Sequence, residues 1–81
     1  MVRLNSAARI LVVDDDKNIR NTFTAILEDE GYTVDLANCG KEALKKTDSS
    51  FYNIALLDIR LPDMEGVELL IKMRNTSPKM R

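Results

Sequence analysis

Four aspartates in this sequence follow directly on short apolar runs: Asp14, Asp15, Asp16 and Asp58. The first three follow ILVV at 10–13, and the last follows NIALL at 53–57. Two carboxylates ~5 Å apart at an effective dielectric constant of ~20 repel each other by roughly 3 kcal/mol. Such groups are tolerated when they are protonated, well solvated or bound to a cation, and Mg²⁺ takes one or two carboxylates together with several waters. The acidic residues therefore indicate a site for Mg²⁺, or for Mn²⁺ in its place.

The aspartate triplet also has a purely structural interpretation. Asp16 is placed to cap a helix that the pattern predicts after it, and negative charge near a helix N-terminus is favourable. For an isolated acidic triplet this would be the commoner explanation. The second strand-terminal aspartate, Asp58, with Pro62 and Gly66 behind it, favours the metal site instead.

The elements that must position these aspartates alternate between strands and helices. Short apolar or alternating runs predict strands at 10–13, 32–37 and 53–57. Apolar residues at helical spacing predict helices at 17–30, 41–48 and 66–75, the last marked by Val67, Leu70, Ile71 and Arg74. This order predicts a parallel sheet with right-handed crossovers and helices on both faces. In such sheets functional groups gather at the carboxyl ends of strands, so we expect Asp14, Asp15 and Asp58 to converge in one cleft.

Length and composition narrow the class of protein. A chain of 81 residues has room for one small domain with a thin hydrophobic core. Twelve basic and thirteen acidic residues give a net charge of −1, which does not indicate a surface for nucleic acid. No apolar run has the length of a membrane span, and the first residues lack the apolar core of a signal peptide, so we expect a cytoplasmic protein. The single cysteine, Cys39, fits a reducing compartment.

The combined pattern resembles the receiver domain of two-component response regulators. The matching segments are ILVVDDD (10–16), GYTVDLANCGKEAL (31–44) and LLDIRLPDMEGVELL (56–70). The last segment contains D-x-x-x-P-D-x-x-G as Asp58, Pro62, Asp63 and Gly66. The resemblance covers nearly the whole chain after residue 8, and the combination of motifs is highly specific. It implies an α/β, flavodoxin-like fold in truncated form, with a three-stranded parallel sheet in order 2-1-3 and three helices.

The resemblance also implies a role for each acidic residue. Asp58 would be the phosphoryl acceptor. Asp15 would be the main carboxylate ligand of Mg²⁺, Asp14 would act largely through a metal-bound water, and the backbone carbonyl of Arg60 would complete the protein's share of the coordination. The phosphoryl donor would be a sensor histidine kinase or a phosphotransfer protein, and the domain itself would not be an enzyme.

The sequence departs from the family's pattern after the third helix. Receiver domains continue with two more strands and two more helices, and they carry a Ser/Thr and a Lys for which these 81 residues offer no counterpart. We therefore expect residues 1–81 to form a partial receiver domain with impaired phosphorylation and a flexible segment at 1–8. We also expect a homo-oligomer through the exposed third strand. The expected interface residues are Ile54, Leu56, Leu70 and Met73.

Two other functions remain open from the sequence. The first is an interaction or assembly module that uses a receiver scaffold without phosphotransfer. The second is a phosphatase, because Asp14 and Asp16 resemble the D-x-D pair of haloacid-dehalogenase-type enzymes. That family has Thr or Val two residues after its second aspartate, where this chain has Asn18, so the match is poor.

Overall fold

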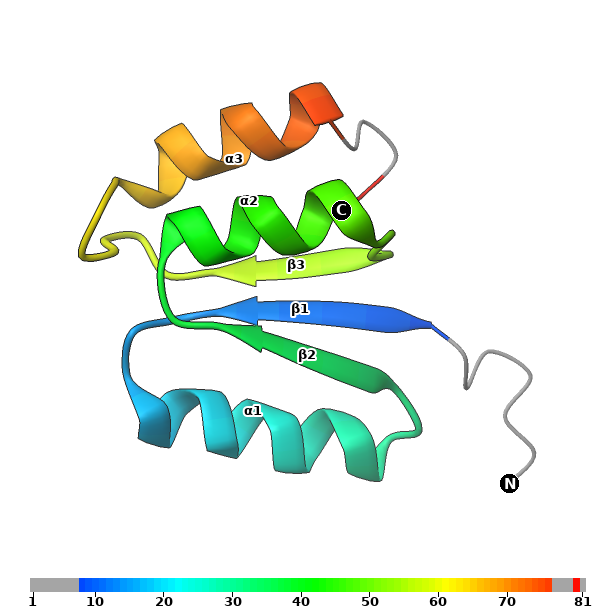
Figure 1. The fold of residues 1–81 in the computed structure, drawn as a ribbon. Helices are drawn as coiled ribbons and strands as arrows, with labels where there is room; N and C mark the ends of the chain where they lie inside the picture. The colour runs from blue at the N-terminus through cyan, green and yellow to red at the C-terminus, as the bar shows by residue number, and fades with distance from the viewer. Residues whose placement is uncertain (1–7, 77–79, 81) are drawn as a thin grey trace.

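The chain forms a small α/β fold in which strands and helices alternate (Figure 1). The computed structural model describes residues 8–76 and residue 80. The elements are β1 (Arg9–Val13), α1 (Lys17–Asp29), β2 (Thr33–Ala37), α2 (Gly40–Ser49), β3 (Ile54–Leu57) and α3 (Gly66–Thr76). All six predicted elements are confirmed, each with bounds close to those predicted. The segment predicted to be flexible, 1–8, lies outside the described residues except for Ala8.

The three strands form one parallel sheet in the order β2-β1-β3, as predicted. Val13, the last residue of β1, lies opposite Ala37 of β2 and Leu57 of β3. The strands therefore end side by side, and the residue that follows each of them enters the same edge of the sheet. This register is what brings distant aspartates together.

Local signals at its two ends explain where α1 begins and ends. Oδ1 of Asp16, the N-cap, accepts hydrogen bonds from the backbone N–H groups of Asn18 at 2.8 Å and Ile19 at 3.4 Å. After the helix, Gly31 has a φ of 95°, a conformation in which a side chain would be strained. Both residues act as the sequence predicts.

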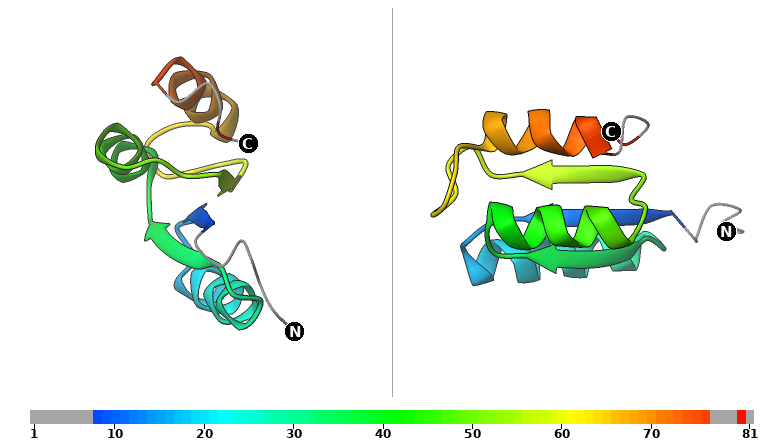
Figure 2. Two further views of the ribbon diagram at one scale, coloured as in Figure 1. Left: turned by 90° about the vertical axis from the view of Figure 1, so that its right-hand side faces the viewer. Right: turned by 45° about the horizontal axis from the view of Figure 1, so that its top comes forward.

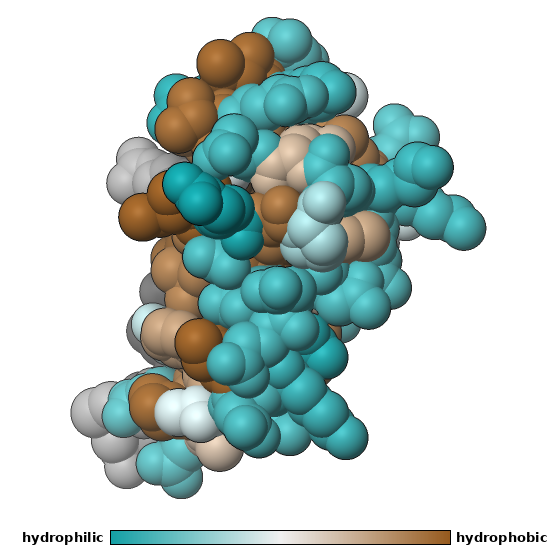
Figure 3. Space-filling model, turned by 90° about the vertical axis from the view of Figure 1, so that its left-hand side faces the viewer, coloured by the Kyte–Doolittle hydropathy of each residue, from teal (hydrophilic) through white to brown (hydrophobic). Residues whose placement is uncertain are grey.

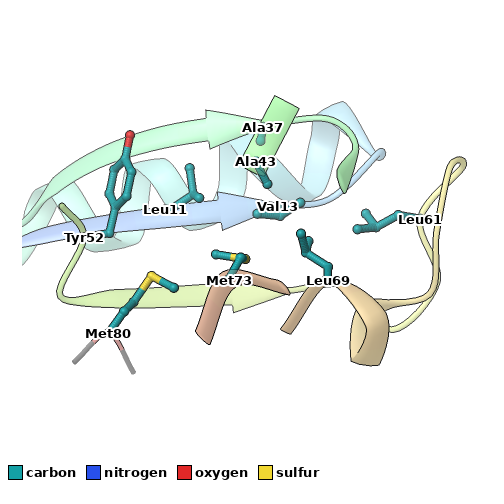
Figure 4. Packing of buried hydrophobic residues seen from close by; sticks show 9 residues of the cluster. All are labelled: Leu11, Val13, Ala37, Ala43, Tyr52, Leu61, Leu69, Met73 and Met80. Atoms are coloured by element: carbon teal, nitrogen blue, oxygen red, sulfur yellow. The ribbon is translucent and has the colours of Figure 1, made fainter. Parts of the chain in front are cut away.

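The two faces of the sheet are covered unequally. Seen along the strands, α1 lies on one side of the sheet and α2 and α3 lie on the other (Figure 2). The main core fills the α2–α3 side (Figure 4). Its buried members are Leu11, Val13, Ala37, Ala43, Tyr52, Leu61, Leu69, Met73 and Met80. On the other side, α1 contributes no fully buried residue. Within the described residues, no helix is long and apolar enough to cross a membrane.

The inward face of α3 is not formed by the apolar residues whose spacing predicted the helix. Leu69 and Met73 are fully buried, whereas Val67 is 65% exposed and Ile71 is 58% exposed. The apolar residues of α3 lie on more than one side of the helix, so spacing alone could not select the side that meets the core. Met73, expected at an interface between copies, is instead a core residue.

An open apolar groove of about 470 Å³ runs between α1 and β3. Its apolar lining includes Val12, Ile19, Phe23, Ala55, Leu56 and Leu57. Phe23 and Ile19 are each about 40% exposed there, because nothing among the described residues covers this side. Figure 3 looks onto the end of the molecule where the strands finish, and apolar side chains gather along one border of that view.

Candidate functional site

Sheet hydrogen bonds fix the aspartates that follow β1 and β3. The backbone N–H of Asp14 donates to the carbonyl oxygen of Ala37 at 3.1 Å, and the N–H of Asp58 donates to the carbonyl oxygen of Val13 at 2.9 Å. Each aspartate is therefore held by the neighbouring strand, one residue past the end of its own. The sheet supplies a rigid base for both side chains.

Asp14, Asp15 and Asp58 form a cluster of carboxylates at this edge of the sheet. One oxygen from each residue can be chosen so that all three lie within 4.8 Å of one another. Asp14 and Asp58 are half-buried, and Asp15 is exposed. Arg9–Asp35 and Glu68–Lys72 are side-chain ion pairs among the described residues, and neither involves this cluster. The convergence predicted from the sequence is thus present, and no ion pair with another described residue offsets its negative charge.

The neighbours of Asp14 leave its carboxylate partly free. Its Oδ1 accepts a hydrogen bond from the backbone N–H of Asp16 at 2.9 Å. The guanidinium of Arg20 donates to the backbone carbonyl of Asp14 at 2.8 Å. Arg20 is therefore bound beside the cluster through the main chain, and a second carboxylate oxygen of Asp14 is left for a cation.

The third aspartate of the triplet has a different task. The carboxylate of Asp16 caps α1 and does not belong to the cluster. The pairing of Asp14 with Asp16 that a dehalogenase-type phosphatase would use is therefore not formed. The structural interpretation of the triplet holds for Asp16, and the metal-site interpretation suits the other two.

The segment between β3 and α3, residues 58–65, forms a tight loop beside the cluster. Arg60 and Glu65 pair in an isolated antiparallel bridge. The backbone N–H of Leu61 donates to the carbonyl oxygen of Met64 at 3.0 Å, and the N–H of Gly66 donates to the carbonyl oxygen of Ile59 at 2.6 Å. These two hydrogen bonds form the bridge, so it uses neither the carbonyl nor the N–H of Arg60 itself. The carbonyl oxygen of Arg60 accepts no hydrogen bond from any residue that the structure describes. It is available as a neutral oxygen ligand.

Gly66 is required by the closeness of this loop to Asp58. A Cβ added at Gly66 would clash with the carbonyl oxygen of Asp58 and would lie 3.0 Å from the carbonyl oxygen of Ile59. Both are backbone atoms and cannot rotate away. The glycine of the D-x-x-x-P-D-x-x-G motif thus permits α3 to begin directly against the residue that carries the central carboxylate.

Asp63 has a role that the sequence analysis missed. Its two carboxylate oxygens accept hydrogen bonds from the backbone N–H groups of Gly40 and Lys41, each at 2.8 Å. These two N–H groups hold the pKa of the Asp63 carboxyl below its usual value. The motif marked Asp63, but no local signal links it to a helix that starts more than twenty residues earlier.

Comparison with known proteins places these features in a family. The model of the response regulator receiver domain matches residues 10–81. A CAI-1 autoinducer sensor kinase/phosphatase, CqsS of Vibrio cholerae, is 49% identical over 84% of this chain. The match spans only 10% of that relative, so the similarity concerns one small part of CqsS.

Solved structures give the same result. A CheY-like receiver domain protein from Methanospirillum hungatei superposes with a TM-score of 0.91 and 49% identity, covering 93% of this chain and 60% of that one. The response regulator TrrA of Thermotoga maritima, in complex with Mg²⁺ and beryllofluoride, has a TM-score of 0.86 and 42% identity over 91% of this chain and 64% of its own. TrrA has also been solved in complex with the histidine kinase ThkA.

Proposed function

The chain belongs to the response regulator receiver domain family, and on that premise we propose that it accepts a phosphoryl group at Asp58 in a Mg²⁺-dependent reaction. The observation that carries this proposal is the cluster of three carboxylates at the strand ends, with an uncommitted backbone carbonyl nearby. Oxygen ligands of this kind suit Mg²⁺. Asp58 is the cluster member that begins the loop containing Pro62 and ending at Gly66, the first residue of α3.

The carboxylate cluster and the β3–α3 loop would both supply ligands to the metal ion. Asp15, Asp58 and the carbonyl oxygen of Arg60 would hold Mg²⁺, with Asp14 supporting it through a bound water. When bound, the ion offsets the negative charge that an incoming phosphoryl group brings to the carboxylates. A carboxylate oxygen of Asp58 attacks the phosphorus of a phosphohistidine whose other ring nitrogen carries a proton. The phosphorus–nitrogen bond breaks with its electron pair on nitrogen, so the imidazole leaves as the neutral ring. The product is an acyl phosphate on Asp58.

The proposed donor is a sensor histidine kinase. The structure of TrrA with a histidine kinase supports this class of partner, and the TrrA complex with Mg²⁺ and beryllofluoride supports the metal. A chain that receives its phosphoryl group from such a kinase would act in the cytoplasm. The domain would serve as a substrate of the kinase and not as an enzyme in its own right.

Phosphorylation with a small donor tests the acceptor residue. The protein is incubated with acetyl phosphate and Mg²⁺, the acyl phosphate is trapped with borohydride, and the modified residue is found by mass spectrometry. We expect label on Asp58, none in Asp58→Asn, and normal labelling in Asp48→Asn, which removes an exposed aspartate of α2. Label on another aspartate, or Mg²⁺-independent labelling, would contradict the proposal. No labelling at all would favour an interaction module.

Labelling of this 81-residue polypeptide should be slow. No lysine or arginine among the described residues pairs with a carboxylate of the cluster, and Arg20 beside it is engaged by the backbone carbonyl of Asp14, so we expect these cations to stabilise phosphoryl oxygens little. We therefore propose that the polypeptide is an impaired acceptor when studied on its own. A labelling rate equal to that of TrrA under the same conditions would show that this is wrong.

We also propose that the 81-residue polypeptide self-associates through the open side of β3. Ile54 on this strand is 38% exposed, and Leu70 on α3 is 42% exposed. A strand edge that carries apolar side chains can pair with its own copy about a two-fold axis. Light scattering should report a dimer or larger assembly that Leu70→Lys weakens. Asn75→Lys, which adds the same charge elsewhere on α3, should leave it intact, and a wild-type monomer at high concentration would contradict the proposal.

A further inference from the structure

Asp63 connects a loop to a helix that is far from it in sequence. It lies in the loop between β3 and α3, and it binds the first two backbone N–H groups of α2. Both bonds are 2.8 Å long, and both acceptors belong to one carboxylate. Bonds from backbone N–H groups to a charged acceptor are stronger and better defined than neutral ones. Asp63 is therefore a firm contact between the loop and α2.

The neighbouring residue strengthens the same contact. A Cβ at Gly40 would lie 2.5 Å from Sδ of Met64, so the side chain of Met64 occupies space that only a glycine leaves open. Met64 also packs against the main core. Two consecutive loop residues, Asp63 and Met64, thus meet the first residue of α2, one through hydrogen bonds and one through packing.

The contact closes a ring of hydrogen bonds around the carboxylate cluster. Asp58 is bonded to the end of β1, and Asp14 is bonded to Ala37 at the end of β2. From there the chain runs through Asn38 and Cys39 to α2, and Asp63 returns from α2 to the loop that contains Arg60. Without Asp63 the loop would be held by its own internal bonds and by the packing of Leu61 and Met64, and no hydrogen bond would join it to α2.

We propose that Asp63 is a positioning residue for the metal site. By binding α2 it fixes the loop that carries Arg60 relative to Asp14 and Asp15, which lie across the cluster. This inference rests on the proposed function, since it concerns the affinity of that site for Mg²⁺. Supporting groups behind the ligands of a metal site commonly alter its affinity by about tenfold or more.

Isothermal titration with Mg²⁺ tests the proposal on three variants. Asp63→Ala should bind Mg²⁺ about tenfold more weakly than wild type. Asp63→Asn retains one acceptor oxygen and should lie between the two. The matched control is Glu42→Ala, because Oε1 of Glu42 accepts the backbone N–H of Asn38 at 2.7 Å beside the same helix start. Glu42→Ala removes the same charge without touching the β3–α3 loop, and it should bind Mg²⁺ like wild type.

Hydrogen exchange in the metal-free protein tests the loop directly. Asp63→Ala should speed exchange at the N–H groups of Leu61 and Gly66, which close the loop, and Glu42→Ala should not. Equal loss of affinity in Asp63→Ala and Glu42→Ala would overturn the inference, as would unchanged affinity in Asp63→Ala. A wild-type protein that binds no Mg²⁺ would overturn the proposed function, and the role of Asp63 in metal binding with it.

Discussion

The two ends of the sheet treat carboxylates in opposite ways. Toward the amino end, Arg9 and Tyr52 bind Asp35, the middle residue of β2: the Tyr52 hydroxyl donates a hydrogen bond to its carboxylate at 2.6 Å, and the guanidinium of Arg9 pairs with it at 2.9 Å. Arg9 also lies over the ring of Tyr52, 5.1 Å from its centre. At the carboxyl end, three carboxylates crowd together, and no ion pair reaches them within the described part of the chain.

This difference separates Asp35, whose charge stabilises the fold, from the carboxylates of the proposed metal site. The Tyr52 hydroxyl, more than any other group, lowers the pKa of Asp35, so the ionised form of Asp35 stabilises the fold. Burial, more than the hydrogen bond to Asp35, raises the pKa of Tyr52 to about 12. Among the described residues the carboxyl-end cluster has no comparable ion pair, so we expect its mutual repulsion to oppose folding unless a cation is bound. The stabilising charge contacts described here lie at one end of the sheet, and the proposed Mg²⁺ site lies at the other.

The largest change in stability is expected from a methyl group added at Gly66, beside the carboxyl end of the sheet. Gly66→Ala places a Cβ against the carbonyl oxygen of Asp58, where only backbone movement can relieve the clash. We expect the free energy of unfolding to fall by about 3 kcal/mol, measured by urea denaturation followed by circular dichroism. Gly40→Ala is the control, because its clash is with the flexible side chain of Met64, and it should cost clearly less. Equal losses would show that the fit around Asp58 is not tight.

The next largest effect is expected from the ionisation of Tyr52 at alkaline pH. Tyr52 stays neutral in the folded protein up to about pH 12, whereas in the unfolded chain it ionises near pH 10. The stability it contributes is complete below pH 10 and is lost as pH rises through the folded value. The loss should reach roughly 2 kcal/mol at pH 12 relative to Tyr52→Phe. In a Tyr32→Phe background, absorbance at the tyrosinate band would follow Tyr52 alone, and ionisation near pH 10 would contradict the prediction.

Replacing the structural carboxylate should destabilise the protein. Asp35→Asn removes the charged acceptor of Tyr52 and Arg9, and we expect a loss of about 1.5 kcal/mol in unfolding free energy at neutral pH. The loss is limited because the side chain of Asp35 is 34% exposed. Acid should act in the same direction: the pKa of Asp35 is lowered from 3.8, so its contribution is present above that pH and disappears as pH falls through the lowered value. An unchanged urea midpoint for Asp35→Asn would remove the contrast between the two ends.

The same substitution at the other end should have the opposite sign. Asp15→Asn relieves repulsion in the cluster, so without metal we expect unfolding free energy to rise by about 0.5 kcal/mol. Millimolar Mg²⁺ should stabilise the wild type by mass action and the variant much less. Thermal unfolding with and without Mg²⁺ measures both effects. If Asp15→Asn is less stable than wild type without metal and gains as much from Mg²⁺, the cluster is not a strained cation site.

Local signals were sufficient to predict most of the fold and the carboxylate cluster. Apolar runs that end in aspartate identified β1 and β3, and Asp16 and Gly31 defined the ends of α1. Because parallel strands finish at one edge, the meeting of Asp14 with Asp58 followed from strand order. These features depend on residues close together in sequence or on general rules of sheet topology.

The features that sequence analysis missed depend on contacts between distant elements. The side of α3 that enters the core was not predicted and Met73 was wrongly expected at an interface, because Leu69 and Met73 are selected by the position of α2 and the sheet and not by spacing. The bond from Asp63 to Gly40 needs the exact placement of two loops. Likewise, Tyr52, just before β3, meets Asp35 of β2 only because both of these strands pair with β1 in the folded sheet.

The central place of β1 also affects the order in which the chain can fold. During synthesis β1 emerges first, yet both of its neighbours, β2 and β3, come later. Arg9 finds its partner Asn53 only 44 residues further along, a delay of some seconds at about 5 to 20 residues per second. Over that interval β1 presents unpaired apolar edges to chaperones and to other nascent chains. The strand made first is therefore the one that waits longest to be paired on both sides.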